Sequence, residues 1–329
     1  MNRTKPLSAI KNLFVKYREA GILLITVVLI IFFYLYSPDH AFGDMRNIQV
    51  ILRVGPEVGL IAIPVTLLMV AREFDLSVGS ALAFCSLVMV WLYNIYHVNV
   101  WIAFFITLVT GALIGLINGL ITTRFNIPSF ITTLGTLYFW RGIVYVISGG
   151  WPVSHRMDLD EPLFHNIFAG EVAGIPVQLF WFIAMTVVLG IILHRHSFGN
   201  KIFATGGNEA AAKAMGINTK KVKIICFMLV GLGVALASVI QADRVRGSFA
   251  TSGEGMEFLA IASTVIGGTA LFGGIGTVIG TFIGVILLRV IESGLIVCGV
   301  GGYWFYAVMG VVIVAAVVAN TFIERRRKK

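Results

Sequence analysis

The chain has 329 residues, of which 58% are hydrophobic and 12% charged, and its mean hydropathy is +0.92. A soluble domain carries about 45 to 50% apolar and about 25% charged residues, so a secreted enzyme, a cytosolic dehydrogenase and a nucleic-acid-binding protein are excluded. In a membrane protein the net charge of +9 reports orientation. Cys85, Cys226 and Cys298 fall in apolar runs without the spacing of a disulfide framework or a metal site, so no metal is expected.

Apolar runs predict an all-α membrane protein with about ten transmembrane helices, since a span needs about 20 apolar residues. In chain order the predicted spans are 20–37, 54–71, 78–96, 98–121, 128–147, 176–194, 224–241, 257–270, 275–293 and 303–321. The eighth is short and ends in glycine, which is typical of a half-span or a re-entrant segment.

Charge predicts the orientation of these spans. With the N-terminus in the cytoplasm, most of the 25 lysine and arginine residues fall in inner segments and most of the 16 acids on the outer side. Both termini are therefore expected to be cytoplasmic. The predicted organisation is a cytoplasmic N-terminal segment (1–19), a transmembrane domain (20–321) and a basic cytoplasmic tail (322–329).

Two long loops are expected to form docking surfaces on opposite sides of the membrane. The stretch 148–175 lies outside and is acidic, whereas 195–223 lies inside, is basic and is rich in alanine and glycine. A transport subunit with one partner on each face would need both surfaces.

Glycine recurs at every fourth position in the fourth and ninth spans, which lets helix backbones approach closely. The residues are Gly111, Gly115, Gly119, Gly276, Gly280 and Gly284. The two triplets are about half the chain apart and their spans run in opposite directions. This leads to the hypothesis of two five-helix halves that are inverted copies, the usual architecture of an alternating-access pathway; the alternative is ordinary glycine packing.

No sequence motif for energy conversion or catalysis is found, so the chain is not expected to be an enzyme. The glycines of 268–274 lack the Lys-Ser/Thr of a Walker A loop. Proton- or sodium-driven carriers usually have several acids inside their spans, and here nearly all acids lie in loops. A self-contained channel or secondary carrier is therefore the less favoured alternative, and another subunit is expected to supply the energy.

The inner loop contains one short predicted helix. Asn208 is a good N-cap, Glu209 faces the positive end of the helix, alanines favour helix, and Gly216 supplies a stop. Such a helix on the membrane surface fits a groove on a partner. The alternative is an amphipathic connector without a binding role.

Four motifs make the chain resemble the permease subunits of ribose-type simple-sugar ABC importers. They are Phe74-Asp75-Leu76-Ser77-Val78-Gly79-Ser80, the stretch Ile127-Pro128-Ser129 to Leu137, Gly206-Gly207-Asn208-Glu209-Ala210-Ala211, and Ile266-Gly267-Gly268-Thr269 with Gly273-Gly274-Ile275-Gly276. They occur in the family's order, and the resemblance extends over nearly the whole chain.

The resemblance implies a multi-pass protein of the bacterial inner membrane that lies in lipid and binds no nucleic acid. Its implied partners are a second permease subunit, in a homodimer or a heterodimer, a cytoplasmic ATPase and a periplasmic sugar-binding protein. ATP and Mg would bind the ATPase, so this chain would hold no cofactor. The coupling helix would include Asn208, Glu209, Ala210, Ala211 and Gly216, although Gly216 follows Glu209 by seven positions where the family has six. Nucleosides, autoinducer-2 and branched-chain amino acids are alternative solutes.

The motif at Asp75 has two candidate roles. Together with Ser77 and Gly79 it forms either a turn that satisfies broken backbone or a charged gate, and the turn is favoured. Arg72 and Glu73 replace glycines that are found in many members of the family.

A neutral polyol requires hydroxyl, amide and aromatic contacts along its path. Candidate path residues are Asn118, Phe130, Thr132 and Thr133, for which core packing is the alternative role.

Overall fold

The computed structural model describes residues 18–327, and nearly all of its regular structure is helical. Within these residues seven helices are long and apolar enough to cross a membrane. They are α2 (Arg18–Tyr36), α3 (Met45–Val70), α5 (Val100–Phe125), α6 (Ser129–Ser148), α9 (Val177–His194), α12 (Thr219–Val245) and α14 (Val278–Val297). Shorter apolar helices are α4 (Val78–Asn94), α13 (Met256–Ile266) and the first part of α15 (Trp304–Arg327). The chain is therefore an all-α multi-pass membrane protein, while the number of ten spans stays a prediction.

Three predicted boundaries are wrong in the same way. Helix α3 begins at Met45 rather than at residue 54, α12 extends over Thr219–Val245 rather than 224–241, and α15 continues to Arg327. Residues 322–327 continue this helix, and their place in a cytoplasmic tail stays a prediction. Hydropathy detects only the apolar part of a helix, whereas the backbone hydrogen bonds continue through charged residues at its ends. The predicted segment 1–19 lies almost entirely outside the described residues.

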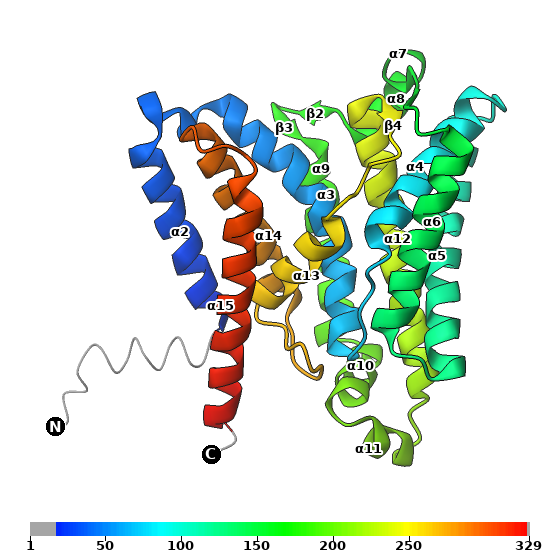
Figure 1. Ribbon diagram of the computed structural model, residues 1–329, viewed down its shortest axis with the longest axis vertical. Coiled ribbons are helices and arrows are strands. Elements are labelled where there is room, and N and C mark those ends of the chain that lie inside the picture. Colours follow the sequence, from blue (N-terminus) through cyan, green and yellow to red (C-terminus); the bar gives the residue numbers. More distant parts are fainter. Residues whose placement is uncertain (1–17, 328–329) are drawn as a thin grey trace.

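The two ends of the molecule differ (Figure 1). One end carries α10 (Ser197–Gly207) and α11 (Glu209–Ala214), and α15 also ends towards this end of the molecule. The opposite end carries the short elements β1 (Val153–Ser154), α7 (Met157–Asp160), α8 (Pro162–Phe168), β2 (Glu171–Val172), β3 (Ile175–Pro176), β4 (Gly247–Ser248) and the 3-10 helix η1 (Pro38–Gly43). Strand β1 pairs antiparallel with β4, and β2 with β3. The charge-based orientation assigns the end with α10 and α11 to the cytoplasm.

The core is built around α3 and α12. Helix α3 is buried from Gly55 to Val70, and α12 packs against α3, α4 and α5. The first glycine triplet makes the α5–α12 contact. A Cβ on Gly111 would lie 2.3 Å from the carbonyl oxygen of Gly231, and one on Gly115 would lie 2.1 Å from that of Phe227. Only glycine allows these backbones to approach so closely.

The second triplet contacts a different partner. Added Cβ atoms on Gly280 and Gly284 would meet the carbonyl oxygens of Gly267 and Ser263, so these glycines pack α14 against α13. Gly276 lies in the loop before α14 rather than in the helix. In the same loop, the backbone N–H of Gly274 bonds to the carbonyl oxygen of Val70 instead of continuing a helix. The inverted repeat stays a prediction.

Helix α13 has the length expected of a half-span. Its 11 residues rise about 16 Å, roughly half of the hydrocarbon thickness. In Figure 1 it lies midway between the two ends of the molecule, as does the start of α4.

Candidate functional site

The loop 71–77, between α3 and α4, is the point at which all four sequence motifs meet. Helix α3 ends where Arg72 adopts a left-handed conformation, with a φ of +70°. The chain then crosses to α4 without helical backbone bonds of its own, so its N–H groups need other partners. Hydroxyls of α6 and the carboxylate of Asp75 supply these partners, and an amide of α5 donates to the side chains of the loop.

Asp75 is the centre of this loop. One carboxylate oxygen, Oδ1, accepts hydrogen bonds from the backbone N–H of Ser77 at 2.8 Å and from its hydroxyl at 2.6 Å. The Nδ2 of Asn118 on α5 donates to Asp75 Oδ2 at 3.2 Å and to the Ser77 hydroxyl at 2.8 Å. These three side chains are buried. The contacts fit the favoured prediction of a structural turn.

Helix α6 holds the same loop through two hydroxyls. Ser129 accepts a hydrogen bond from the N–H of Phe74, and Thr133 accepts one from the N–H of Leu76, both at 3.0 Å. Two of the candidate path residues, Asn118 and Thr133, therefore bond to the loop. Thr132 is buried without a hydrogen-bond partner for its hydroxyl among the described residues, and Phe130 is 55% exposed on α6. A role of these four residues in the path stays a prediction.

Gly79 lies in the first turn of α4, against the chain that leads into α13. A Cβ at Gly79 would lie 2.2 Å from the Gly253 carbonyl oxygen and 2.5 Å from Glu257 Oε2. Arg141 of α6 donates to the carbonyl oxygen of Ser252 at 2.9 Å. The starts of α4 and α13 are thus in backbone contact, and α6 is bonded to the same segment.

The end of α10 also packs against this region. A Cβ on Gly206 would lie 1.7 Å from the carbonyl oxygen of Val70, and the N–H of Gly274 donates to that same oxygen at 2.8 Å. Gly206, the end of α3 and the 267–277 loop therefore touch through their backbones. No larger residue fits at Gly206 without moving one of these segments.

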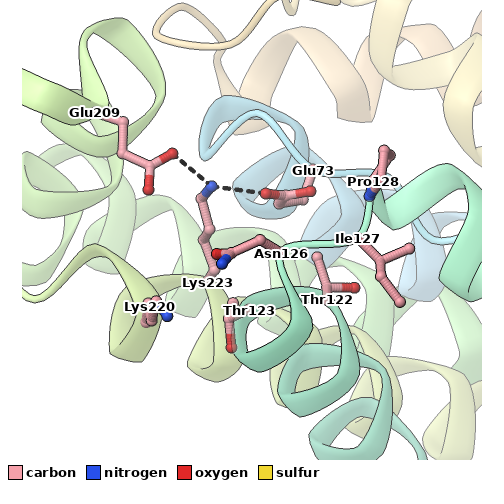
Figure 2. A pocket seen from close by; sticks show the side chains of 9 residues that line it. All are labelled: Glu73, Thr122, Thr123, Asn126, Ile127, Pro128, Glu209, Lys220 and Lys223. Carbon is pink, nitrogen blue, oxygen red and sulfur yellow. Dashed lines mark hydrogen bonds and ion pairs between the residues drawn. The ribbon is translucent and has the colours of Figure 1, made fainter.

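An ion-pair cluster joins α11 to α12 and to the 71–77 loop (Figure 2). Lys223 Nζ lies 2.8 Å from Glu209 Oε2 and 2.7 Å from Glu73 Oε1. The other oxygen of Glu209 pairs with Lys213 at 2.8 Å and accepts a bond from Thr219 at 3.1 Å. Partial burial alone would raise the pKa of Glu209, but the bonds from Lys213, Lys223 and Thr219 outweigh it and lower the pKa to about 2.

The cluster borders a polar pocket of about 270 Å³. Figure 2 shows its lining residues: Glu73, Thr122, Thr123, Asn126, Ile127, Pro128, Glu209, Lys220 and Lys223. Asn126 adopts a φ of +54°, which ends α5 and turns the chain into α6. Over residues 18–327, no group of three or more His, Cys, Asp or Glu side chains is placed to hold a metal ion.

Helix α11 has an inner and an outer side. Asn208 caps it as predicted, because its Oδ1 accepts a bond from the N–H of Ala211 at 3.0 Å. Glu209 is partly exposed and bonds to Lys223 of α12, Ala212 is buried, and Ala210 and Ala211 are exposed. Met215, directly after the helix, is 83% exposed. Gly216, with a φ of +81°, lets the chain turn away towards α12.

Sequence reasoning missed Glu73 and Lys223 as partners. Glu73 was noted only as a departure from the family, and Lys223 only as one of several basic residues in the inner loop. Opposite charges at the ends of neighbouring apolar helices indicate that an ion pair can form there, but which two charges meet depends on how the helices pack. Helix packing also decides the partner of the buried Glu57 of α3, whose carboxylate pairs with Arg244 of α12 at 2.5 Å.

At the opposite end, two acids and a histidine of the predicted outer loop have charged partners. Asp158 pairs with Arg246 at 3.0 Å, Glu171 pairs with Arg53, and His165 lies 3.1 Å from Asp243. Asp160 is exposed. These contacts attach the loop to α3 and α12.

Comparison with known proteins gives one matching family, described as branched-chain amino acid transport system / permease component, over residues 47–317. The chain is 34% identical over 311 residues to a probable ABC transporter permease protein, YphD, of Escherichia coli K12, covering 94% of this chain and 92% of the relative.

Two further relatives carry sugar names. The xylose/arabinose import permease protein XylH of Sulfolobus acidocaldarius is 34% identical, with 94% of this chain and 87% of the relative covered. The ribose import permease protein RbsC of E. coli K12 is 35% identical, with 92% and 93% covered.

Proposed function

The chain belongs to the family of branched-chain amino acid transport system permease components, and from this premise we propose that it is the permease subunit of an ABC importer for a sugar. The observation that carries the proposal is α11, a capped helix that is exposed on one side and ion-paired on the other to the 71–77 loop. A helix with these contacts is suited to pass a force from a partner into the membrane domain. The relatives named for ribose and xylose/arabinose support a sugar as the solute.

A cytoplasmic ATPase is the proposed partner at α11. The exposed Ala210, Ala211 and Met215 offer small residues and one flexible apolar side chain, which suit a groove. The carboxylate of Glu209 bonds to Thr219 and Lys223 within the chain, and its place in the coupling helix stays a prediction. ATP and Mg would bind that ATPase, and this chain would contribute no group to hydrolysis.

On the opposite face, the loop of 148–175 is the proposed docking surface for a periplasmic sugar-binding protein. The ion pairs to Arg53 and Arg246 give that loop a fixed shape, and Asp160 remains exposed on it. A second permease subunit would complete the pathway. The assembly would lie in a bacterial inner membrane, with both termini in the cytoplasm.

A branched-chain amino acid is the second candidate solute, because the family description names that class. A zwitterion needs a fixed charge of each sign in its path, whereas a sugar needs hydroxyl-bonding groups. Glu57 is buried and its carboxylate is already bonded to Arg244, so this pair offers no free charge to a zwitterion, which favours the neutral solute.

The test is reconstitution of the chain with its genomic-neighbour ATPase and binding protein in liposomes. We expect ATP-dependent uptake of radiolabelled D-ribose or D-xylose. Uptake of L-leucine without either sugar would establish the second candidate. Failure of the ATPase to bind the wild-type chain would overturn the importer proposal, and Met215→Glu should weaken binding where Lys220→Glu does not.

A further inference from the structure

Three charged side chains from three separate segments form one continuous bridge near the cytoplasmic pocket. Glu209 comes from α11, Lys223 from α12 and Glu73 from the 71–77 loop, and Figure 2 shows Lys223 between the two carboxylates. The Lys223 and Glu73 side chains are only 12% and 11% exposed. A charge with so little access to water is costly to leave unpaired, so these groups stay together when one of them moves.

The loop at one end of this bridge is connected onward to two helices. Asn118 of α5 bonds to Asp75, and Ser129 and Thr133 of α6 bond to the backbone of Phe74 and Leu76. A displacement of Glu73 is therefore transmitted to α6, the helix that follows the pocket. The backbone of Gly206 packs against Val70, directly before this loop, but this contact is steric and is not a hydrogen bond.

We propose that Lys223 is a positioning residue that couples α11 to the 71–77 loop, so that movement of α11 displaces the loop and α6 with it. The proposal rests on the proposed function, because it assigns the route by which an ATPase at α11 would act on the membrane domain. Glu73 supplies the far end of the bridge. A chain with glycine at that position would lack this link.

The first experiment needs neither partner nor solute. Hydrogen–deuterium exchange of the purified chain in nanodiscs is compared for wild type, Glu73→Gln, Glu209→Gln and Lys220→Met. Lys220 lines the same pocket, lies in no described ion pair, and serves as the control. We expect each glutamine variant to speed exchange by about threefold or more in the distant segment as well as its own.

Faster exchange in the segment that does not carry the substitution distinguishes coupling of the two segments from local stabilisation of each. Glu73→Gln should loosen 209–216, and Glu209→Gln should loosen 71–77, whereas Lys220→Met should change neither. If each variant alters only its own segment, Lys223 merely stabilises two neighbours and the proposal is overturned.

The second experiment measures solute moved per ATP hydrolysed in the reconstituted importer. Glu73→Gln and Lys223→Met should lower that ratio by about tenfold while ATPase binding changes by less than about twofold. Lys223→Arg should keep the transport ratio near that of the wild type, since a guanidinium also bonds two carboxylates. A normal ratio in Glu73→Gln refutes the coupling role even where Lys223→Met fails to fold. A wild-type complex that moves no sugar refutes the proposed function instead. The exchange experiment then still tests whether Lys223 couples α11 to the 71–77 loop.

Discussion

Helices α5 and α6 are consecutive and both apolar, yet the protein uses them in opposite ways. In α5, Gly111 and Gly115 lie against backbone atoms of α12, so a Cβ at either would approach them to less than 2.5 Å. In α6, Gly135 and Gly142 have nothing within 4 Å of an added Cβ. Similar glycine content therefore marks a rigid internal contact in one helix and an uncovered face in the other.

Both helices nevertheless hold the 71–77 loop, and they do so with different chemistry. Helix α5 supplies the Asn118 amide to a buried carboxylate, whereas α6 supplies neutral hydroxyls to backbone N–H groups. Hydrogen bonds to charged groups contribute more than bonds between neutral groups. We interpret α5 as the support of the buried carboxylate and α6 as the support of the loop backbone, which also bonds through Arg141 to the segment before α13.

The largest effect is expected from Gly115→Val. The new side chain would push α5 away from the Phe227 carbonyl, destabilising the fold by about 3 kcal/mol or more. Thermal unfolding followed by size-exclusion chromatography in detergent measures the loss. The matched control is Gly142→Val in α6; an equal loss there would contradict the distinction between the two helices.

Asn118→Ala tests the charged support from α5. It removes a donor from the buried Asp75 carboxylate and should cost about 2 to 3 kcal/mol. The same thermal assay, compared with Asn118→Asp, would check the reason: aspartate places a second carboxylate beside Asp75 and should be worse than alanine. An aspartate variant more stable than alanine would show that Asp75 is protonated in the fold.

Thr133→Val tests the hydroxyl support from α6. Valine keeps the shape but leaves the N–H of Leu76 without its acceptor, for an expected loss of about 1 to 2 kcal/mol. Exchange of the Leu76 amide should accelerate more than that of Phe74, whose acceptor is Ser129. Equal acceleration of both amides would indicate that the loop moves as one unit.

The smallest effect on stability is expected from Gly135→Leu, within about 0.5 kcal/mol, because no atom of residues 18–327, apart from the adjoining backbone of α6 itself, lies within 4 Å of a Cβ added at this site. Its effect should appear in assembly instead, if α6 faces a second permease subunit. Crosslinking in native membranes would measure dimer formation. A stability loss as large as that of Gly115→Val would mean that α6 is covered within the chain.

The sequence predicted the apolar helices and the cap of α11 well. Hydropathy depends on local composition, and the Asn208 cap depends on residues within one turn. Helix ends were less well predicted, since Met45 and Arg244 lie in helices that continue past their apolar parts. Helix α10 was not predicted at all, because its polar and glycine residues look like a loop.

Composition and charge by themselves determined that this protein is a multi-pass membrane protein, because the cost of charge in lipid constrains every span separately. Only the tertiary structure decided which charges meet. Glu209 belongs to the predicted coupling helix, and the fold pairs it with Lys223, whose ammonium also bonds to Glu73 from a distant part of the chain. Such pairing depends on the packing of α11, α12 and the end of α3, and no local pattern specifies that packing.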